Sequence, residues 1–328
     1  MTDSWFAVTG GAKLFVRKWA PESGVRGIIQ IVHGMREHSL RYERLAVRLC
    51  EAGFEVWAAD MRGHGRTADL KVNDPSQGGQ LGHCADRRAV ARLVSDIHLI
   101  NLAIHKQYPG LPLFLMGHSW GSFLAQAYIE RYSELRNAPR LAGCILSGTR
   151  GPDGGVLVQL GGPFLALLSL FHKRRGKSRL AVALADGAYA KAFAPARTPL
   201  DWLSSDTDAV DAYIADPLCG QMPSLGFYRD LAFTLRQIHR KKNMERIPLD
   251  LPVYVFSGSR DPVGNMGESP RALVEWYTTH GMDDVGFVLY PDARHEMLHE
   301  TNYTEVQENL LAWINKHITS SIKQMARE

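Results

Sequence analysis

The sequence has few of the features that mark secreted, zinc-binding or nucleic-acid-binding proteins. Its 328 residues include only four cysteines, which are far apart and form no C-x-x-C pair: Cys50, Cys84, Cys144 and Cys219. This spacing favours neither disulfide bonds nor a zinc site, and Cys144, inside an apolar run, is expected to be a small buried core residue. The 38 basic and 34 acidic side chains leave a net charge of only +4, which argues against a nucleic-acid-binding protein.

Long apolar segments are also missing. The N-terminus has no cationic stretch followed by an apolar one, so no secretory signal is recognised and a cytoplasmic location is expected. The apolar run at 156–171 is interrupted by Gly161-Gly162-Pro163 and is shorter than the ~20 residues that cross a bilayer. We expect it to form a cap helix packed on the core, a pocket wall or a membrane-docking surface. The basic run at 172–179 predicts a solvated loop, with transient contact to an anionic membrane surface as the alternative.

Short apolar runs alternate with segments of helical periodicity along most of the chain. The runs predicted as strands are 28–32, 54–59, 113–116, 141–146, 253–256 and 285–290. The segments predicted as helices include 42–51, 87–106, 122–131, 270–279 and a final one with an apolar stripe from Tyr303 to Ile318. This alternation predicts an α/β fold with a mostly parallel, doubly wound sheet covered on both faces. Residues 6–19 predict an antiparallel hairpin at the sheet edge.

The alternation stops between residues 151 and 247, where helical fragments occur without a convincing strand. We therefore expect two parts: a core formed by 1–150 and 248–328, and an inserted helical cap at 151–247. One sequence does not set the oligomeric state.

A candidate nucleophile lies in the sequence Gly117-His118-Ser119-Trp120-Gly121, which matches G-x-S-x-G. The motif directly follows a predicted strand and precedes a predicted helix, which is the setting that this motif requires. Small residues on both sides let the strand and the helix approach closely, so that the Ser119 hydroxyl projects above the sheet.

A serine hydroxyl is a weak nucleophile and needs a base that is held by a carboxylate. Asp261 and His295 each follow a predicted strand, and the carboxyl ends of parallel strands form one rim. We predict Ser119, Asp261 and His295 as a catalytic triad. His299 is the alternative base and Asp153 the alternative acid.

Acyl transfer also needs backbone N–H groups that stabilise an oxyanion. We expect these from Trp120, which follows the nucleophile, and from Met35, in the loop after an earlier strand, where Gly34 allows a sharp turn. His33 and His38 could suggest a metal pair, but no carboxylate or cysteine cluster completes it in the sequence, so neither a metal nor a cofactor is expected.

These residues resemble the α/β-hydrolases, in the branch of monoacylglycerol lipases, lysophospholipases and serine aminopeptidase-like enzymes. The resemblance spans nearly the whole chain and rests on five motifs, at 33–38 with Arg41-Tyr42, at 60–65, 117–121, 257–262 and 293–296. It implies the same triad and the same two oxyanion-hole amides. The chain departs from the pattern at Trp120-Gly121-Ser122, where such lipases usually carry Met-Gly-Gly, and at Thr67, where a serine is usual. A tryptophan beside the nucleophile is expected to narrow the acyl pocket, and the 60–65 loop is expected to be a structural turn beside the site.

The leading functional hypothesis is a serine esterase that forms an acyl-enzyme on a monoacylglycerol, a lysophospholipid or a similar medium- or long-chain ester. An aminopeptidase or amidase is the second hypothesis, and it requires cap carboxylates that bind a substrate ammonium group. A noncatalytic small-molecule binder is the third, because a fold does not fix a function.

Overall fold

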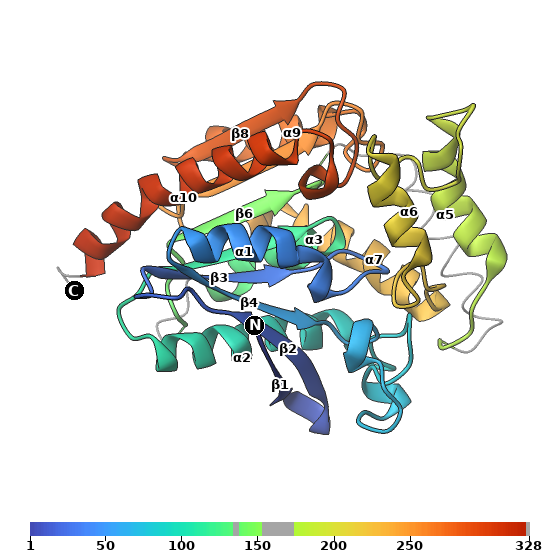
Figure 1. Ribbon diagram of the computed structural model, residues 1–328, viewed down its shortest axis with the longest axis horizontal. Helices are drawn as coiled ribbons and strands as arrows, with labels where there is room; N and C mark the ends of the chain where they lie inside the picture. Colours follow the sequence, from blue (N-terminus) through green and yellow to red (C-terminus); the bar gives the residue numbers. More distant parts are fainter. Residues whose placement is uncertain (134–137, 153–173, 326–328) are drawn as a thin grey trace.

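A single eight-stranded sheet runs through the computed structural model, which describes residues 1–133, 138–152 and 174–325 (Figure 1). The strand order is β1-β2-β4-β3-β5-β6-β7-β8. The pairs β1–β2 and β2–β4 are antiparallel and all later pairs are parallel, so the predicted edge hairpin and the mostly parallel sheet are confirmed. The strands are β1 (Thr2–Ala7), β2 (Lys13–Trp19), β3 (Gly27–Val32), β4 (Phe54–Asp60), β5 (Leu113–His118), β6 (Gly143–Ser147), β7 (Val253–Gly258) and β8 (Val285–Tyr290).

The central strands are apolar along their whole length because both faces of the sheet are covered. Ile31, Met116, Ile145 and Tyr254 stand in register across β3, β5, β6 and β7 and belong to the core of one face. Their chain neighbours point to the opposite core, since side chains alternate along a strand. Cys144 is fully buried in that second core, as predicted, and all four cysteines are free thiols.

Two layers of helices enclose the sheet. Side chains of α1 and α10 belong to the core of one face, and those of α2, α3 and α9 to the core of the other. The helices are α1 (Glu43–Glu51), α2 (Ala89–Gln107), α3 (Trp120–Tyr132), α5 (Arg179–Lys191), α6 (Thr207–Ala215), α7 (Leu225–Ile238), α8 (Lys241–Met244), α9 (Glu268–His280) and α10 (Tyr303–Met325). Helix α10 buries Val306, Leu310, Ile314 and Ile318, which is the apolar stripe read from the sequence.

Between β6 and β7 the described residues form helices α5 to α8 joined by turns and irregular segments, and they contribute no β-strand to the sheet. Helices α5 and α6 lie beyond one end of the sheet (Figure 1), whereas α7 packs against α2 and α3. The predicted apolar helix at 156–171 lies outside the described residues. In the basic run that follows it, Arg174 and Arg175 form ion pairs with Asp230 and Asp86, at 2.6 and 2.5 Å.

No helix in the described ranges combines the length and the apolar character needed to cross a membrane.

The carboxyl ends of the parallel strands meet at one edge of the sheet. Val32 is in register with Gly117, His118 with Ser147, and Gly258 with Tyr290. The loops that carry the predicted site residues leave the sheet from this edge, so residues far apart in the chain come together there.

Candidate active site

Ser119 occupies a sharp turn between β5 and α3. Its backbone has φ 52° and ψ −122°, a conformation that a residue with a side chain adopts only under constraint. Its N–H donates to the carbonyl oxygen of Ser147 on the neighbouring strand, at 2.8 Å, which holds the turn against the sheet. Helix α3 begins at Trp120, two residues before the predicted start, because Ser119 itself is the N-cap.

Two glycines make this turn possible. A Cβ at Gly121 would overlap the carbonyl oxygen of Val32 at the end of β3, and one at Gly117 would overlap the carbonyl oxygen of Gly121. The expectation that the flanks of the serine must be small is therefore met by two close backbone approaches.

The structure brings the predicted base and acid into line with Ser119. The His295 Nε2 atom lies 2.8 Å from the Ser119 Oγ atom, and His295 Nδ1 lies 3.0 Å from Asp261 Oδ2. A carboxylate can only accept, so Nδ1 carries the proton and Nε2 is free to accept the hydroxyl proton of Ser119. Asp261 also accepts from the Val263 N–H at 2.8 Å and from the Ser257 hydroxyl at 3.2 Å, which fixes its orientation.

Asp261 and His295 shift each other's pKa toward the charged form. Burial raises the pKa of Asp261, but His295 and the Val263 N–H outweigh it and leave the pKa below its usual value. Burial lowers the pKa of His295, but the Asp261 carboxylate outweighs it and leaves the pKa above 6.5. Asp261 thus stays ionised, and His295 binds a proton more readily than a free imidazole does.

The loop after β3 lies directly against Ser119. A Cβ at Gly34 would stand 3.4 Å from the Ser119 Cβ atom, and Met35 and Ser119 line the same cavity. His33 orients the peptide between Gly34 and Met35, because its Nδ1 lies 2.7 Å from the Gly34 carbonyl oxygen while its Nε2 accepts from the Met61 N–H at 2.9 Å. In a trans peptide the Met35 N–H then points away from His33.

The other predicted oxyanion amide belongs to Trp120, in the first turn of α3. The first N–H groups of a helix have no partner within the helix, so this amide is available to an oxygen at Ser119. The Trp120 ring is buried, with centroids 5.0 Å from His64 and 5.1 Å from Phe227, and it does not line the cavity over Ser119. The expected narrowing of the acyl pocket by this ring is therefore not seen around that cavity.

A buried ionic network joins the Met35 loop to the His295 loop. Arg41 donates to Glu37 at 2.7 Å and to both carboxylate oxygens of Glu296, each at 2.7 Å. Glu37 also accepts from the Gly34 N–H at 2.5 Å and from the Tyr42 hydroxyl at 2.8 Å. Because Glu296 adjoins His295, Arg41 fixes the two loops relative to each other.

The cavity over Ser119 has a volume of about 30 Å³. Its walls include side chains from the segment after β6, namely Leu200, Trp202, Leu203 and Tyr213. Trp202 packs on His295 with ring centroids 5.2 Å apart, and the Glu296 N–H donates to the Leu203 carbonyl oxygen at 2.7 Å. The described residues of this segment therefore touch the loop that carries the predicted base.

Comparison with known proteins identifies the family. Residues 23–302 match the family model described as serine aminopeptidase, S33. The chain belongs to this family.

Relatives of this hydrolase cover it almost end to end. It is 28% identical over 315 residues to the monoacylglycerol lipase of Mycolicibacterium smegmatis, an alignment that covers 95% of this chain and 96% of that protein. It is 31% identical over 316 residues to the monoglyceride lipase of Rattus norvegicus, covering 95% and 88%. The solved carboxyl esterase of Bacillus coagulans is similar with a TM-score of 0.86 and 30% identity, covering 97% of this chain and 98% of that one. The hydrolase thus has the α/β-hydrolase fold and is a carboxylic-ester hydrolase.

The alternative base, His299, does not line the cavity over Ser119. His299 ends the short 3-10 helix η5 (Met297–His299), where burial and the nearby Arg41 lower its pKa to about 4. Asp153 lies outside the described residues.

Sequence reasoning assigned no role to Arg41, Glu37 and Glu296, although all three fall in the motifs of the resemblance. A signal existed in their residue types, because charged residues next to a predicted oxyanion loop and a predicted base are unusual in a buried site. Trp202 and Leu203 carried no signal, since nothing in the sequence places them near His295.

The 60–65 loop contacts the loop after β3 through the Met61 N–H, which donates to His33 Nε2 at 2.9 Å. Asp60 is fully buried and accepts from the Ser39 N–H at 2.8 Å and the Arg66 N–H at 2.7 Å. Thr67 takes part through its hydroxyl, which donates to the Asp60 carbonyl oxygen at 2.6 Å and accepts from the Phe15 N–H at 2.8 Å.

One group of side chains has donor atoms suited to a metal. His38, Asp216 and Cys219 offer ligand atoms that lie within 4.8 Å of one another. His38 Nε2 already lies 2.8 Å from Asp216, and burial raises the pKa of the Cys219 thiol, although the Arg41 guanidinium opposes this. A protonated thiol beside a guanidinium is a poor metal ligand, so this group fits a contact between the Met35 loop and the end of α6 better than a metal centre.

Proposed function

We propose that the hydrolase cleaves monoacylglycerols, lysophospholipids or similar medium- and long-chain esters through an acyl-enzyme on Ser119. In this proposal His295 is the general base and Asp261 holds it in the correct tautomer. The backbone N–H groups of Met35 and Trp120 form the oxyanion hole. The observation that carries the proposal is the hydrogen-bonded line Ser119–His295–Asp261, with joining distances of 2.8 and 3.0 Å.

The reaction follows from this geometry. The Ser119 Oγ attacks the ester carbonyl carbon while His295 Nε2 takes the hydroxyl proton, and the resulting oxyanion binds the two N–H groups. His295 then gives the proton to the leaving alcohol, which departs and leaves the acyl group on Ser119. Water attacks that acyl group with His295 again as base, and the carboxylic acid leaves as Ser119 recovers its proton.

The carboxylates around the site favour an ester over the free N-terminus of a peptide. An aminopeptidase needs a carboxylate that is free to bind an ammonium group. Glu37 and Glu296 are the acidic residues among the described lining of the cavity, and Arg41 binds both.

The aspartates of 151–247 that could serve an aminopeptidase have other roles in the described structure. Asp206 caps α6, and Asp208 lies in the first turn of that helix, where an acidic side chain is favourable. Asp201 accepts from the Thr198 hydroxyl and the Arg197 N–H, at 2.6 and 2.7 Å. Asp211 pairs with Arg197 and Asp216 pairs with His38, each at 2.8 Å. The side chain of Asp186 is not among those described.

We further propose that residues 151–247 act as a cap on a core formed by 1–150 and 248–328. The contacts of Trp202 with His295 and of Leu203 with Glu296 support this role, since they place the segment over Ser119. A cavity of about 30 Å³ has room for roughly one water molecule, so an acyl chain requires the side chains of the cap to move apart. The ion pairs of Arg174 and Arg175 leave these two cations engaged within the chain, which weighs against the membrane-contact alternative for them.

The test is hydrolysis of p-nitrophenyl esters from acetyl to palmitoyl, with monoacylglycerol, a lysophospholipid and an aminoacyl anilide as further substrates. Wild type is compared with Ser119→Ala, and the exposed Ser23→Ala is the matched control. A fluorophosphonate, which labels only an activated serine, is applied to all three proteins.

We expect wild type and Ser23→Ala to be labelled and to hydrolyse medium- or long-chain esters, and Ser119→Ala to do neither while remaining folded. Cleavage of the anilide alone would replace the esterase proposal with an aminopeptidase. An unlabelled wild type without turnover would leave a noncatalytic binder as the better description.

A further inference from the structure

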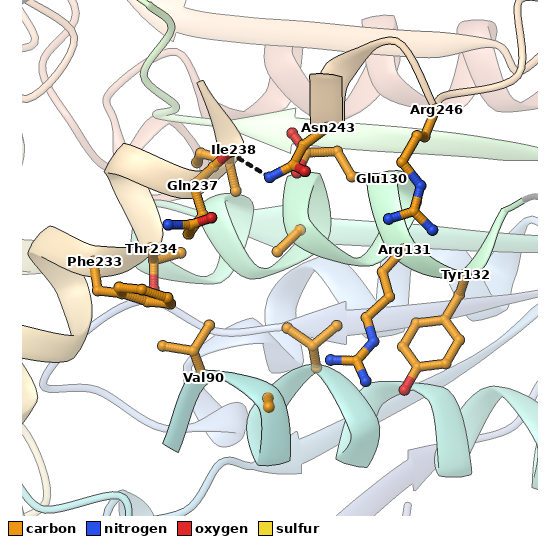
Figure 2. A pocket seen from close by; sticks show the side chains of 13 residues that line it. Val90, Glu130, Arg131, Tyr132, Phe233, Thr234, Gln237, Ile238, Asn243 and Arg246 are labelled. Carbon is orange, nitrogen blue, oxygen red and sulfur yellow. Dashed lines mark hydrogen bonds between the residues drawn. The ribbon is translucent and has the colours of Figure 1, made fainter. Parts of the chain in front are cut away.

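A second, larger cavity lies away from Ser119, between helices of the core and of the proposed cap. Its volume is about 600 Å³, within the roughly 300–1,000 Å³ typical of small-molecule sites. Helices α2 and α3 supply one wall and α7 and α8 the other (Figure 2). Apolar side chains make up much of the wall, among them Val90, Val94, Phe233 and Ile238.

A buried carboxyl group, that of Glu130, faces this cavity. The Glu130 side chain is only 6% exposed, and it has neither a hydrogen bond nor an ion pair with any residue that the structure describes. Burial raises the pKa of Glu130 to about 9, against the opposing influence of the Arg246 guanidinium. At neutral pH the group is therefore an uncharged acid whose O–H can donate to a ligand.

Two guanidinium groups stand at the same cavity. Arg131 follows Glu130 on α3, and Arg246 lies just after α8; both are exposed and line the space (Figure 2). Within the described ranges neither guanidinium forms an ion pair, although the Arg131 Cζ atom lies 5.3 Å from the centroid of the Tyr132 ring. With Glu130 uncharged, the polar end of the cavity carries two positive charges and one hydrogen-bond donor.

We propose that this cavity is a binding site for an amphiphilic carboxylate, with its apolar chain among the α2 and α7 side chains and its carboxylate between Glu130, Arg131 and Arg246. The apolar walls exclude a ligand that is polar throughout, because burial of unpaired polar groups is costly. The two guanidinium groups repel an ammonium head and attract a carboxylate, which can accept from both of them and from the acid.

This site is separate from the one at Ser119. Glu130 lies eleven residues after Ser119 along α3, which corresponds to about 16 Å at the α-helical rise of about 1.5 Å per residue. The inference does not depend on the proposed function, although a long-chain acid is also the product which that function would release.

Helices α3 and α7 connect the cavity to the active site. Near their N-terminal ends they pack through Trp120 and Phe227, with ring centroids 5.1 Å apart, and near their C-terminal ends they enclose the cavity. A ligand held between these helices therefore contacts the same pair that positions the Trp120 amide beside Ser119.

The test is calorimetric titration of the full chain with dodecanoate, dodecanol and dodecylammonium, each below its critical micelle concentration. The first variant is the double substitution Arg131→Gln with Arg246→Gln, which changes only exposed side chains. Its matched control is Arg236→Gln with Arg240→Gln, two exposed arginines of the same region that do not line the cavity. A second variant, Ala127→Phe, fills the cavity from α3.

We expect dodecanoate to bind tighter than dodecanol and dodecylammonium to bind weakest. The double variant at 131 and 246 should weaken dodecanoate binding roughly 5- to 30-fold, as expected for the loss of two exposed charge pairs. Ala127→Phe should weaken dodecanoate and dodecanol alike, and the control pair should bind as wild type does.

Equal dodecanoate affinity in wild type, Ala127→Phe and the 131/246 variant would place any binding elsewhere and overturn the proposal. If dodecylammonium bound more tightly than dodecanoate, the proposal that the ligand is a carboxylate would be wrong. Thermal unfolding verifies that each variant is folded, and if Ala127→Phe is not, the 131/246 variant decides. Ester hydrolysis measured in parallel, with no fatty acid added, separates this result from the proposed function, because it reports on the site at Ser119 while the cavity holds no added ligand.

Discussion

Substitution of Arg41 by methionine tests whether the buried ionic network holds the active-site loops together. Arg41 is the shared partner of Glu37 and Glu296, and the three side chains are between 3% and 9% exposed. Methionine keeps much of the apolar bulk but leaves two buried carboxylates without their cation. Removal of one partner from a buried ion pair costs about 3–5 kcal/mol, and we expect a loss of free energy of unfolding in this range at pH 7. The melting temperature should fall by roughly 4–8 °C for a chain of this length.

The free energy of unfolding that Arg41→Met loses should be smaller at low pH than at pH 7. Burial raises the pKa of Glu37 and of Glu296, but in the wild type Arg41 outweighs it and leaves both below 4.5. Without Arg41, burial and the neighbouring Glu37 carboxylate should leave the folded pKa of Glu296 above its unfolded value, whereas Glu37 keeps its contacts with the Tyr42 hydroxyl and the Gly34 N–H. Protonation then favours the folded variant, so the difference between wild type and variant should narrow as the pH falls from 7 to about 5.

Urea unfolding at both pH values measures these differences, with ester hydrolysis as a second readout because Glu37 binds the Gly34 N–H beside Ser119. The matched control is Arg48→Met on α1, whose contact with Glu51 is 3.5 Å long and whose two side chains are 44% and 61% exposed. Such an exposed pair contributes about 0.5 kcal/mol or less. If Arg41→Met lost no more stability than this control, or if its loss were independent of pH, the reasoning on the network would be refuted.

Three further predictions concern the residues around Ser119. The value of kcat/KM should fall as the pH is lowered, with a midpoint above 6.5, because the pKa of His295 is raised and only the neutral imidazole accepts the serine proton. A constant kcat/KM down to pH 5 would exclude a histidine base. Asp261→Asn should lower kcat by roughly 10⁴-fold with little change in the circular dichroism spectrum, since an amide no longer fixes the tautomer of His295; activity within tenfold of wild type would contradict this role. Gly121→Ala should destabilise the fold by several kcal/mol because its Cβ overlaps the Val32 carbonyl oxygen. Gly187→Ala, whose added Cβ meets no described atom within 4 Å, should be neutral or slightly stabilising by about 0.5–1 kcal/mol, and urea unfolding of both variants decides.

Local sequence patterns were sufficient for most of the fold. Each of the six apolar runs corresponds to a strand, and the stripe from Val306 to Ile318 to the buried side of α10, because periodicities of 2 and 3.6 residues report directly on burial. Helix ends were less accurate. Helix α3 begins at Trp120 because the turn at Ser119 provides its N-cap, a feature of backbone geometry that periodicity does not reveal.

Local motifs also indicated which residues could form the candidate site. Ser119, Asp261 and His295 were selected from one such motif and from their positions after strands, and parallel strands place such positions at one edge. The packing of the folded chain was needed to bring Arg41 to Glu296, which is 255 residues away, and to place Glu130 at an apolar cavity between α3 and α7. These contacts depend on how separate helices and loops pack. A local pattern encodes which face of an element is buried, whereas the partner of a buried charge is set by residues anywhere in the chain.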